Sequence, residues 1–375
     1  MAIGLSEEDL DSLFEEERKI PDVWLIPKED LEGIQNDILK DDTYNFIVEG
    51  TAGSGKSVLA TYKFMDLVAI HGSNNVTLVV YTLALKEFIK NGLENTIELY
   101  QDEMYTNIKI DELNIFTCEN SSLDKKIDNR EFKYILIDEA QDMKKEFIKK
   151  VGNNIENLMF FGDDGQTLYK DRISMKAIQQ NIPKQLKKYV IDKHYRVPRA
   201  IMKFAQRIVE RNDLVDNCSR EEISYKPTVV KCRDLYNELD FIIDIIEKYS
   251  LKNVGILINN GKEAFEDTRK YFDDRKYKYK YKLDRDTSTL NFNDVDNPTI
   301  ITYHSSKGLQ FDTVFIICCD NNSIYATKKN DKFNYRNSLF VACTRAQRRL
   351  YITCSGILNE FMRNINSNLY ERINY

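Results

Sequence analysis

The stretch Asn45-Phe-Ile-Val-Glu-Gly50-Thr-Ala-Gly-Ser-Gly-Lys56-Ser57 decides the fold of this chain. A short apolar run is followed by G-x-x-x-x-G-K-S, the spacing of a phosphate-binding loop between a buried strand and a helix. The glycines allow backbone N–H groups to turn toward phosphate oxygens, and the N-terminus of the following helix favours negative charge. The loop residues that we expect to hold ATP are Gly50, Thr51, Ala52, Gly53, Ser54, Gly55, Lys56 and Ser57.

Within this loop, Lys56 is expected to reach the β- and γ-phosphates of ATP, and the Ser57 hydroxyl is expected to bind Mg²⁺. Hydrolysis also needs a second magnesium ligand and a group that activates water. Asp138 and Glu139 can supply both, because they directly follow the apolar run Tyr134–Ile137. We expect Asp138 to hold the Mg²⁺ shell and Glu139 to orient or deprotonate the attacking water.

Apolar runs alternate with amphipathic stretches along the rest of the chain. Continuous apolar runs are typical of buried parallel strands, so we predict an α/β protein with parallel sheets. In the first half, the expected strands are Asn45–Glu49, Val76–Tyr81, Leu113–Phe116, Tyr134–Ile137 and Leu158–Phe161. In the second half, they are Tyr189–Ile191, Thr228–Lys231, Val254–Ile258, Thr299–Thr302, Thr313–Cys318 and Leu350–Thr353.

The polar run Ile182–Lys188 separates the two series of strands. We therefore expect a first domain at residues 25–187 and a second domain at residues 188–375. An acidic helix or extension is expected before them, at residues 1–24.

The composition is typical of a soluble globular protein, since 42% of the 375 residues are hydrophobic and 30% are charged. No segment approaches the roughly 20 apolar residues of a membrane span, and the N-terminus lacks the pattern of a secretion signal. We therefore expect a cytoplasmic protein without membrane contact. The seven cysteines and three histidines show no zinc or disulfide spacing. A net charge of −6 leaves nucleic acid open as a partner, because a local groove can be basic on an acidic protein.

One biased stretch, Lys276-Tyr-Lys-Tyr-Lys-Tyr-Lys282, alternates lysine and tyrosine. In a strand this period places the lysines on one face and the tyrosines on the other. The stretch can be a basic ridge that contacts nucleic acid, or an edge strand whose lysines prevent pairing with another chain. We favour the edge strand.

Four further motifs resemble those of the superfamily 1A helicases of the UvrD type. The segments are Phe161-Gly-Asp-Asp-Gly-Gln166-Thr-Leu-Tyr169, His194-Tyr195-Arg196, Thr302-Tyr-His304-Ser305-Ser-Lys307-Gly308-Leu-Gln310-Phe-Asp312 and Val341-Ala-Cys-Thr344-Arg345-Ala346. They are similar, in order, to that family's G-D-x-x-Q-S-I-Y motif, the motif that opens its second core domain, T-x-H-x-x-K-G-L-E-F and V-A-x-T-R-A. The resemblance runs from about Gln35 to Arg345. It implies two RecA-like P-loop NTPase domains with ATP in the cleft between them.

The resemblance also implies how the base and sugar of ATP are held. Gln35 would read the adenine edge, and Tyr195 would stack on adenine. Gly308 and Gln310 belong to the motif that would contact the nucleotide from the second domain. Gln310 stands where the family usually has glutamate, and its amide can still hydrogen-bond a ribose hydroxyl.

Three residues are implied at the γ-phosphate. Gln166 would sense it and link hydrolysis to nucleic-acid binding, and Arg196 would contact it directly. Arg345 would be the arginine finger that the second domain donates across the cleft. An arginine supplied in this way accelerates phosphoryl transfer by about 10³–10⁵.

The expected nucleic-acid track crosses both domains at strand ends. By the same resemblance its residues are Tyr81, Thr82, Thr117, Tyr169, His304 and Ser305. Each of them can instead be a packing residue at a strand end. The tryptophan that stacks on a base in the family is absent, since Lys170 and Asp171 follow Tyr169.

The spacing of the motifs leaves no room for the full-size helical subdomains that relatives insert into each core domain. We therefore predict a reduced, two-lobed motor that uses ATP and Mg²⁺ to move on single-stranded DNA. The resemblance implies movement from 3′ to 5′, and no residue distinguishes DNA from RNA. The alternative is an ATP-gated switch or accessory subunit that regulates a partner protein, such as a nuclease or effector, without processive movement.

Overall fold

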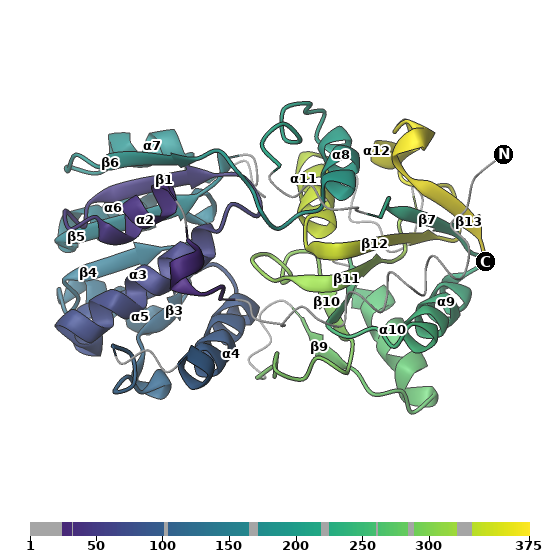
Figure 1. The fold of residues 1–375 in the computed structure, drawn as a ribbon, viewed down its shortest axis with the longest axis horizontal. Coiled ribbons are helices and arrows are strands. Elements are labelled where there is room, and N and C mark those ends of the chain that lie inside the picture. The colour runs from purple at the N-terminus through teal and green to yellow at the C-terminus, as the bar shows by residue number, and fades with distance from the viewer. Residues whose placement is uncertain are drawn as a thin grey trace.

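A computed structural model of the chain describes residues 25–31, 33–100, 104–164, 172–218, 225–259, 262–283, 289–320 and 332–375. These residues form two lobes, each built on a parallel β-sheet with helices on both faces (Figure 1). The predicted α/β class with two parallel sheets is confirmed. The expected extension at residues 1–24, and also Gln166 and Tyr169, lie outside the described residues.

The sheet of the first lobe has the strand order β3-β2-β4-β5-β1-β6. Its strands are β1 (Phe46–Gly50), β2 (Val76–Val80), β3 (Ile115–Thr117), β4 (Tyr134–Ile137), β5 (Asn157–Gly162) and β6 (Lys187–Ile191). Its helices are α2 (Ile34–Lys40), α3 (Lys56–His71), α4 (Leu83–Tyr100), α5 (Ser121–Asp128), α6 (Lys145–Asn154) and α7 (Met175–Asn181). Side chains alternate between the two faces along β1, so Phe46 and Val48 join one apolar cluster and Ile47 joins the other.

The sheet of the second lobe has the order β13-β7-β12-β11-β8-β10-β9. Its strands are β7 (Thr228–Lys231), β8 (Val254–Ile258), β9 (Lys280–Lys282), β10 (Thr299–Thr302), β11 (Phe311–Ile316), β12 (Ala346–Cys354) and β13 (Glu371–Asn374). Its helices are α8 (Arg199–Ile208), α9 (Leu235–Lys248), α10 (Lys262–Asp274), α11 (Lys332–Cys343) and α12 (Glu360–Arg363). Short 3-10 turns are η1 (Lys28–Asp30), η2 (Ser73–Asn75), η3 (Ile110–Glu112), η4 (Ala140–Asp142) and η6 (Ser367–Leu369).

One strand was assigned to the wrong sheet from the sequence. The run Tyr189–Ile191 was expected to open the second series, but it lies in β6, which pairs with β1 in the first sheet. The first sheet therefore ends at Ile191. The prediction that the lysine–tyrosine stretch is an edge strand is confirmed, because β9 lies at one edge of the second sheet. Its last residue, Lys282, is nevertheless buried.

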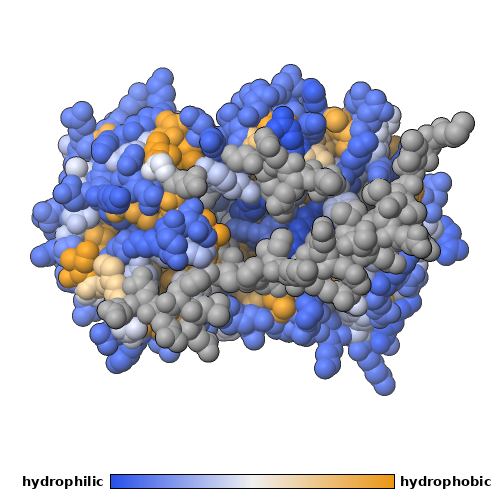
Figure 2. Space-filling model, in the orientation of Figure 1, coloured by the Kyte–Doolittle hydropathy of each residue, from blue (hydrophilic) through white to orange (hydrophobic). Residues whose placement is uncertain are grey.

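The face of the molecule in Figure 2 is largely hydrophilic, with smaller apolar patches over the first lobe. Among the described residues, no helix combines the length and the apolar character that crossing a membrane requires. The carboxyl ends of the first sheet face the second lobe, so the loops that follow β1, β2 and β4 lie between the lobes (Figure 1).

Candidate nucleotide-binding cleft

The glycine-rich loop joins β1 to α3, as the sequence predicts. Gly53 and Gly55 have φ values of +82° and +88°, in the left-handed region that favours glycine. A Cβ atom on Gly53 would lie 3.0 Å from Arg196 Cβ, and one on Gly55 would lie 3.0 Å from Gln35 Nε2. Glycine therefore serves two purposes here: it permits the turn, and it leaves room for side chains from both lobes.

Lys56 lies within the curve of this loop. Its Nζ donates hydrogen bonds to the carbonyl oxygens of Gly50 at 2.7 Å and Thr51 at 3.0 Å. Burial lowers the pKa of Lys56, and Asp163 is the strongest of the nearby carboxylates that oppose this shift. The ammonium group is thus held where negative charge stabilises it, which suits an ion that contacts phosphate.

Asp138 follows β4 and has the properties of a magnesium ligand. Its Oδ1 accepts the Glu139 N–H at 3.0 Å, and its Oδ2 is buried without a hydrogen-bond partner among the described residues. Burial and the neighbouring Glu139 raise the pKa of Asp138 to about 6, while the nearby Ser57 hydroxyl opposes the shift. Carboxylate and hydroxyl oxygens are ligands that Mg²⁺ prefers. The two predicted ligands therefore fit the ion.

Glu139 has a left-handed backbone, with φ of 54°, which is strained for a residue other than glycine. Its Oε2 accepts a hydrogen bond of 2.6 Å from Gln141, whose own Oε1 accepts the Asp163 N–H at 3.0 Å. Burial would raise the pKa of Glu139, but Lys307 and then Lys56 lower it to about 2. The carboxylate is therefore ionised and held in one orientation.

Lys307 extends from the second lobe into the carboxylates of the first. Its side chain is completely buried, forms an ion pair with Asp142, and places Nζ 3.4 Å from Glu139 Oε2. No role was predicted from the sequence for Lys307, Gln141 or Asp142. Their only signal was their place within motifs, because a contact between two separate sheets has no local pattern in the sequence.

The two predicted arginines also lie in the cleft: Arg345 is buried, and Arg196 is half-buried. Arg196 donates from Nη2 to the Thr344 carbonyl at 3.5 Å, and burial lowers its pKa to about 10. Arg345 donates from Nε to the Val341 carbonyl at 2.9 Å. Burial, followed by the charge of Arg196, lowers the pKa of Arg345 to about 9, while Glu139 opposes this shift. Two cations that repel one another thus face a single carboxylate, and an anionic ligand would relieve that repulsion.

The predicted adenine contacts lie on either side of the loop. Gln35 is buried, and its Nε2 donates to the Ser54 carbonyl at 3.4 Å. The Tyr195 N–H donates to the Gly53 carbonyl at 3.0 Å, and its side chain is 44% exposed. Tyr195 is therefore attached to the loop through its backbone, while its ring is accessible.

The motif after β10 meets the first lobe at α4. Gly308 has φ of +83°, and a Cβ atom there would lie 2.7 Å from Leu85 Cδ2. Gln310 accepts a hydrogen bond from Gln347. Gly308 thus allows the two lobes to approach closely, and Gln310 is positioned by its neighbour.

Of the predicted nucleic-acid residues, Tyr81 and His304 meet across the cleft. Their rings lie 5.4 Å apart at an angle of 62°, with His304 Nε2 3.4 Å from the Tyr81 hydroxyl. Thr117 ends β3, beside the end of β2. Thr82 and Ser305 are buried: Thr82 Oγ1 accepts the Leu85 N–H at the start of α4, and the Ser305 N–H donates to Thr302.

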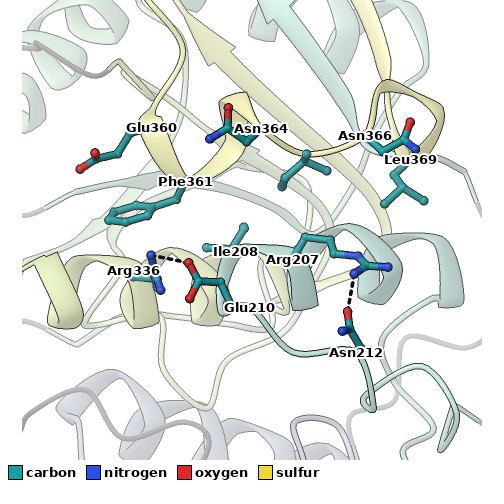
Figure 3. A pocket seen from close by; sticks show the side chains of 11 residues that line it. Arg207, Ile208, Glu210, Asn212, Arg336, Glu360, Phe361, Asn364, Asn366 and Leu369 are labelled. Carbon is teal, nitrogen blue, oxygen red and sulfur yellow. Dashed lines mark hydrogen bonds and ion pairs between the residues drawn. The ribbon is translucent and has the colours of Figure 1, made fainter.

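A hollow of about 1120 Å³ lies on the second lobe between α8, α11 and α12 (Figure 3). The Arg336 guanidinium lies 4.8 Å from the centre of the Phe361 ring and forms an ion pair of 2.9 Å with Glu210. None of the predicted site residues lines this hollow.

The fold and the cleft define the class of this protein: it is a two-lobed P-loop protein of the RecA-like type. The family model described as "UvrD-like helicase C-terminal domain" matches residues 63–356. The chain therefore belongs to the UvrD-like helicase family, and the resemblance seen in the motifs is confirmed.

Two curated relatives match parts of the chain. The "Probable DNA helicase II homolog" of Mycoplasma genitalium is 26% identical over 207 residues, which is 47% of this chain and 29% of the relative. The "Putative ATP-dependent DNA helicase R568" of Acanthamoeba polyphaga mimivirus is 22% identical over 341 residues, which is 84% of this chain and 44% of the relative. The match thus spans less than half the length of either relative.

Two solved structures are more distantly similar. The C-terminal domain of a possible DNA helicase from Lactobacillus plantarum has a TM-score of 0.35 at 19% identity, covering 48% of this chain and 98% of that one. An arterivirus helicase, nonstructural protein 10, has a TM-score of 0.43 at 15% identity, covering 89% of this chain and 64% of that one.

Proposed function

We propose that this chain is an ATP-hydrolysing motor that moves along single-stranded DNA. The observation that carries the proposal is the meeting of groups from both lobes in one cleft. Lys56 and Glu139 come from the first lobe, and Arg196 and Arg345 come from the second. Such a site is complete only when the lobes are together, so it can couple hydrolysis to their movement.

ATP would bind with its phosphates in the loop after β1 and its adenine between Gln35 and the Tyr195 ring. Ser57 and Asp138 would hold Mg²⁺, which supplies positive charge to the phosphate oxygens. The ion is supported by the oxygen ligands available at both positions and by the buried Asp138 Oδ2 that lacks a hydrogen-bond partner among the described residues.

The chain's own residues would carry the remaining steps. Glu139 is ionised and held by Gln141, so it can accept a hydrogen bond from the attacking water and orient it toward the γ-phosphorus. As the water oxygen bonds to phosphorus it gives a proton to the Glu139 carboxylate, the bond to the bridging β-phosphate oxygen breaks, and negative charge develops on that leaving oxygen. Lys56, Arg196 and Arg345 would stabilise that charge.

Nucleic acid would cross the cleft at Tyr81 and His304. The two rings come from opposite lobes, so a strand that contacts both is sensitive to their separation. Stacking of a base on an aromatic ring contributes about 1–3 kcal/mol without reading the sequence. The preference for DNA and the direction from 3′ to 5′ rest on the family resemblance.

The test is ATP turnover measured with single-stranded DNA, duplex DNA, RNA and no polymer. We expect single-stranded DNA to raise the rate most. Lys56→Ala and Glu139→Gln should abolish turnover, while Glu139→Gln retains ATP binding. Lys109→Ala is a matched control, because Lys109 is an exposed lysine of the first lobe that pairs with Glu112. A rate that no polymer changes would contradict the motor.

A second function, an ATP-gated switch that controls a protein partner, is favoured by one observation. Residues 82–133 and 197–298 mostly form elements of the two core lobes in the described parts of the chain. Inserted subdomains that could separate a duplex are not seen there. Under this proposal no polymer stimulates the hydrolysis of ATP. The activity of a co-purifying nuclease or effector would instead depend on which nucleotide is added.

A further inference from the structure

Helix α4 packs on both lobes at once. Leu85, Ile89 and Leu93 belong to the apolar cluster of the first lobe. Ala84 belongs to the cluster of the second lobe, and Phe88 packs against both. Residues three or four apart share one side of a helix, so α4 presents one apolar stripe to its own sheet and another surface to the opposite lobe.

The surface that faces the second lobe carries a buried ion pair. Glu87 Oε1 lies 2.8 Å from the Nζ atom of Lys282, the last residue of β9. Lys282 is buried and the Glu87 side chain is 16% exposed, so most of this contact is shielded from water. Glu87 Oε2 accepts the backbone N–H of Leu290 at 3.2 Å. Both oxygens of one carboxylate thus bind groups of the other lobe.

The same surface continues along α4 for two more turns. Asn91 Oδ1 accepts the Phe292 N–H at 2.9 Å, and the Phe88 and Phe292 rings meet edge to face at 5.3 Å. Asn95 Nδ2 donates to Asn293 Oδ1 at 2.9 Å. The contacts on α4 therefore follow one side of the helix, and they reach Lys282 at the end of β9 and residues 290–293 before β10.

These contacts lie away from the glycine-rich loop. The strand that leads into α4 is β2, and two strands, β4 and β5, separate it from β1 in the sheet. Figure 1 shows α4 and β9 side by side at one end of the space between the lobes, beyond the loop that follows β1. The loop after β1 and the contacts of Glu87, Asn91 and Asn95 therefore join the lobes at different places. Leu85, near the start of α4, packs against Gly308 of the motif after β10.

We propose that α4, Lys282 and residues 290–293 form an interlobe clasp, which holds the lobes together whether or not nucleotide is bound. The clasp is defined by Glu87, Phe88, Asn91, Lys282 and Phe292. Its main-chain donors, Leu290 and Phe292 N–H, are bonded to side chains and lie outside the strands of the sheet, so water can replace these bonds when the lobes separate. The clasp can thus open without disrupting either sheet.

The consequence for turnover rests on the proposed function. Because the catalytic groups come from both lobes, a clasp that favours the closed arrangement also favours assembly of the site without nucleic acid. Weakening it should therefore lower the polymer-free ATPase rate and increase the ratio by which single-stranded DNA stimulates turnover.

The test is hydrogen–deuterium exchange of the nucleotide-free chain, read by mass spectrometry. In Glu87→Gln we expect residues 289–293 and residues 303–310, on the cleft side of the second lobe, to exchange at least tenfold faster. Residues in the sheet cores should be unchanged. Glu112→Gln is the matched control, because it removes an exposed ion pair within the first lobe. The paired exchange Glu87→Lys with Lys282→Glu should restore much of the protection.

Faster exchange confined to residues 289–293, with residues 303–310 unchanged, would overturn the clasp. It would show that the contact stabilises only the local packing of residues 289–293. No change at either segment would overturn it as well. If Glu87→Gln unfolds, Phe292→Ala tests the same surface without disturbing the buried ion pair. The exchange experiment does not need ATP turnover, so failure of the clasp and failure of the proposed motor give different results.

Discussion

We expect Lys307→Met to destabilise the protein by about 3 kcal/mol at neutral pH. Lys307 is the strongest of the charges that lower the pKa of Glu139 from 4.5 to about 2, despite burial that acts in the opposite direction. That shift is the joint effect of Lys307, Lys56 and the Gln141 hydrogen bond, so Lys307 accounts for only part of it. Removing one partner of a buried ion pair costs about 3–5 kcal/mol because it leaves the other charge uncompensated, and this sets the expected size of the effect. Asp142 loses its ion pair with Lys307 in the same variant.

The pH dependence follows from the direction of that shift. Because the pKa of Glu139 is lower in the folded protein than in the unfolded chain, its stabilisation is present above about pH 4.5. The stabilisation is lost as the pH falls toward about 2. The stability difference between wild type and Lys307→Met should therefore be largest near neutral pH and should shrink below about pH 4.5.

Thermal unfolding followed by circular dichroism measures this effect. A loss of about 3 kcal/mol corresponds to a fall in Tm of roughly 6–12 °C for a unit of 150–250 residues. Lys109→Met is the control, since Lys109 pairs with Glu112 at the surface and should change Tm by little. A Tm for Lys307→Met equal to that of wild type at pH 7, or a difference that grows as the pH falls, would refute the reasoning.

Three other predictions concern the cleft. Arg345→Ala should lower kcat by about 10³–10⁵ while a fluorescent ATP analogue still binds; a loss below tenfold would argue against an arginine finger. Gly55→Ala should weaken nucleotide binding at least tenfold with the circular dichroism spectrum unchanged, because φ of +88° is costly for alanine; unchanged affinity would contradict this. Tyr81→Ala should weaken binding of a labelled single-stranded oligonucleotide by about 1–3 kcal/mol in fluorescence anisotropy. Equal affinity of that variant and wild type would leave Tyr81 as a packing residue.

Much of the fold could be predicted because its signals are local. The strand before Gly50, the glycines and the helix after Lys56 lie next to one another in the sequence, and the structure has them in that order. The apolar runs at Val76 and Tyr134 likewise form central strands, since strands buried on both faces contain few polar residues.

The errors and omissions concern contacts between distant parts of the chain. In β6, Lys187 and Lys188 are exposed at the edge of the first sheet, and their run is equally compatible with either lobe until its pairing with β1 is known. Similarly, Glu87 and Lys282 have the pattern of ordinary surface charges in the sequence. Only the docking of α4 on the other lobe makes them a buried pair.

The cations of the cleft explain why a nucleotide would favour the closed arrangement. Burial lowers the pKa of Lys56, Arg196 and Arg345, so in each case the charged form is disfavoured relative to water. Arg196 and Arg345 also repel one another. Phosphate groups placed among the three would reverse both effects, and they would do so most strongly when the lobes are closed. Binding of ATP would then stabilise the closed arrangement in addition to the α4 clasp. Loss of the γ-phosphate after hydrolysis would remove the stabilisation that comes from the nucleotide and leave the stabilisation that comes from the clasp.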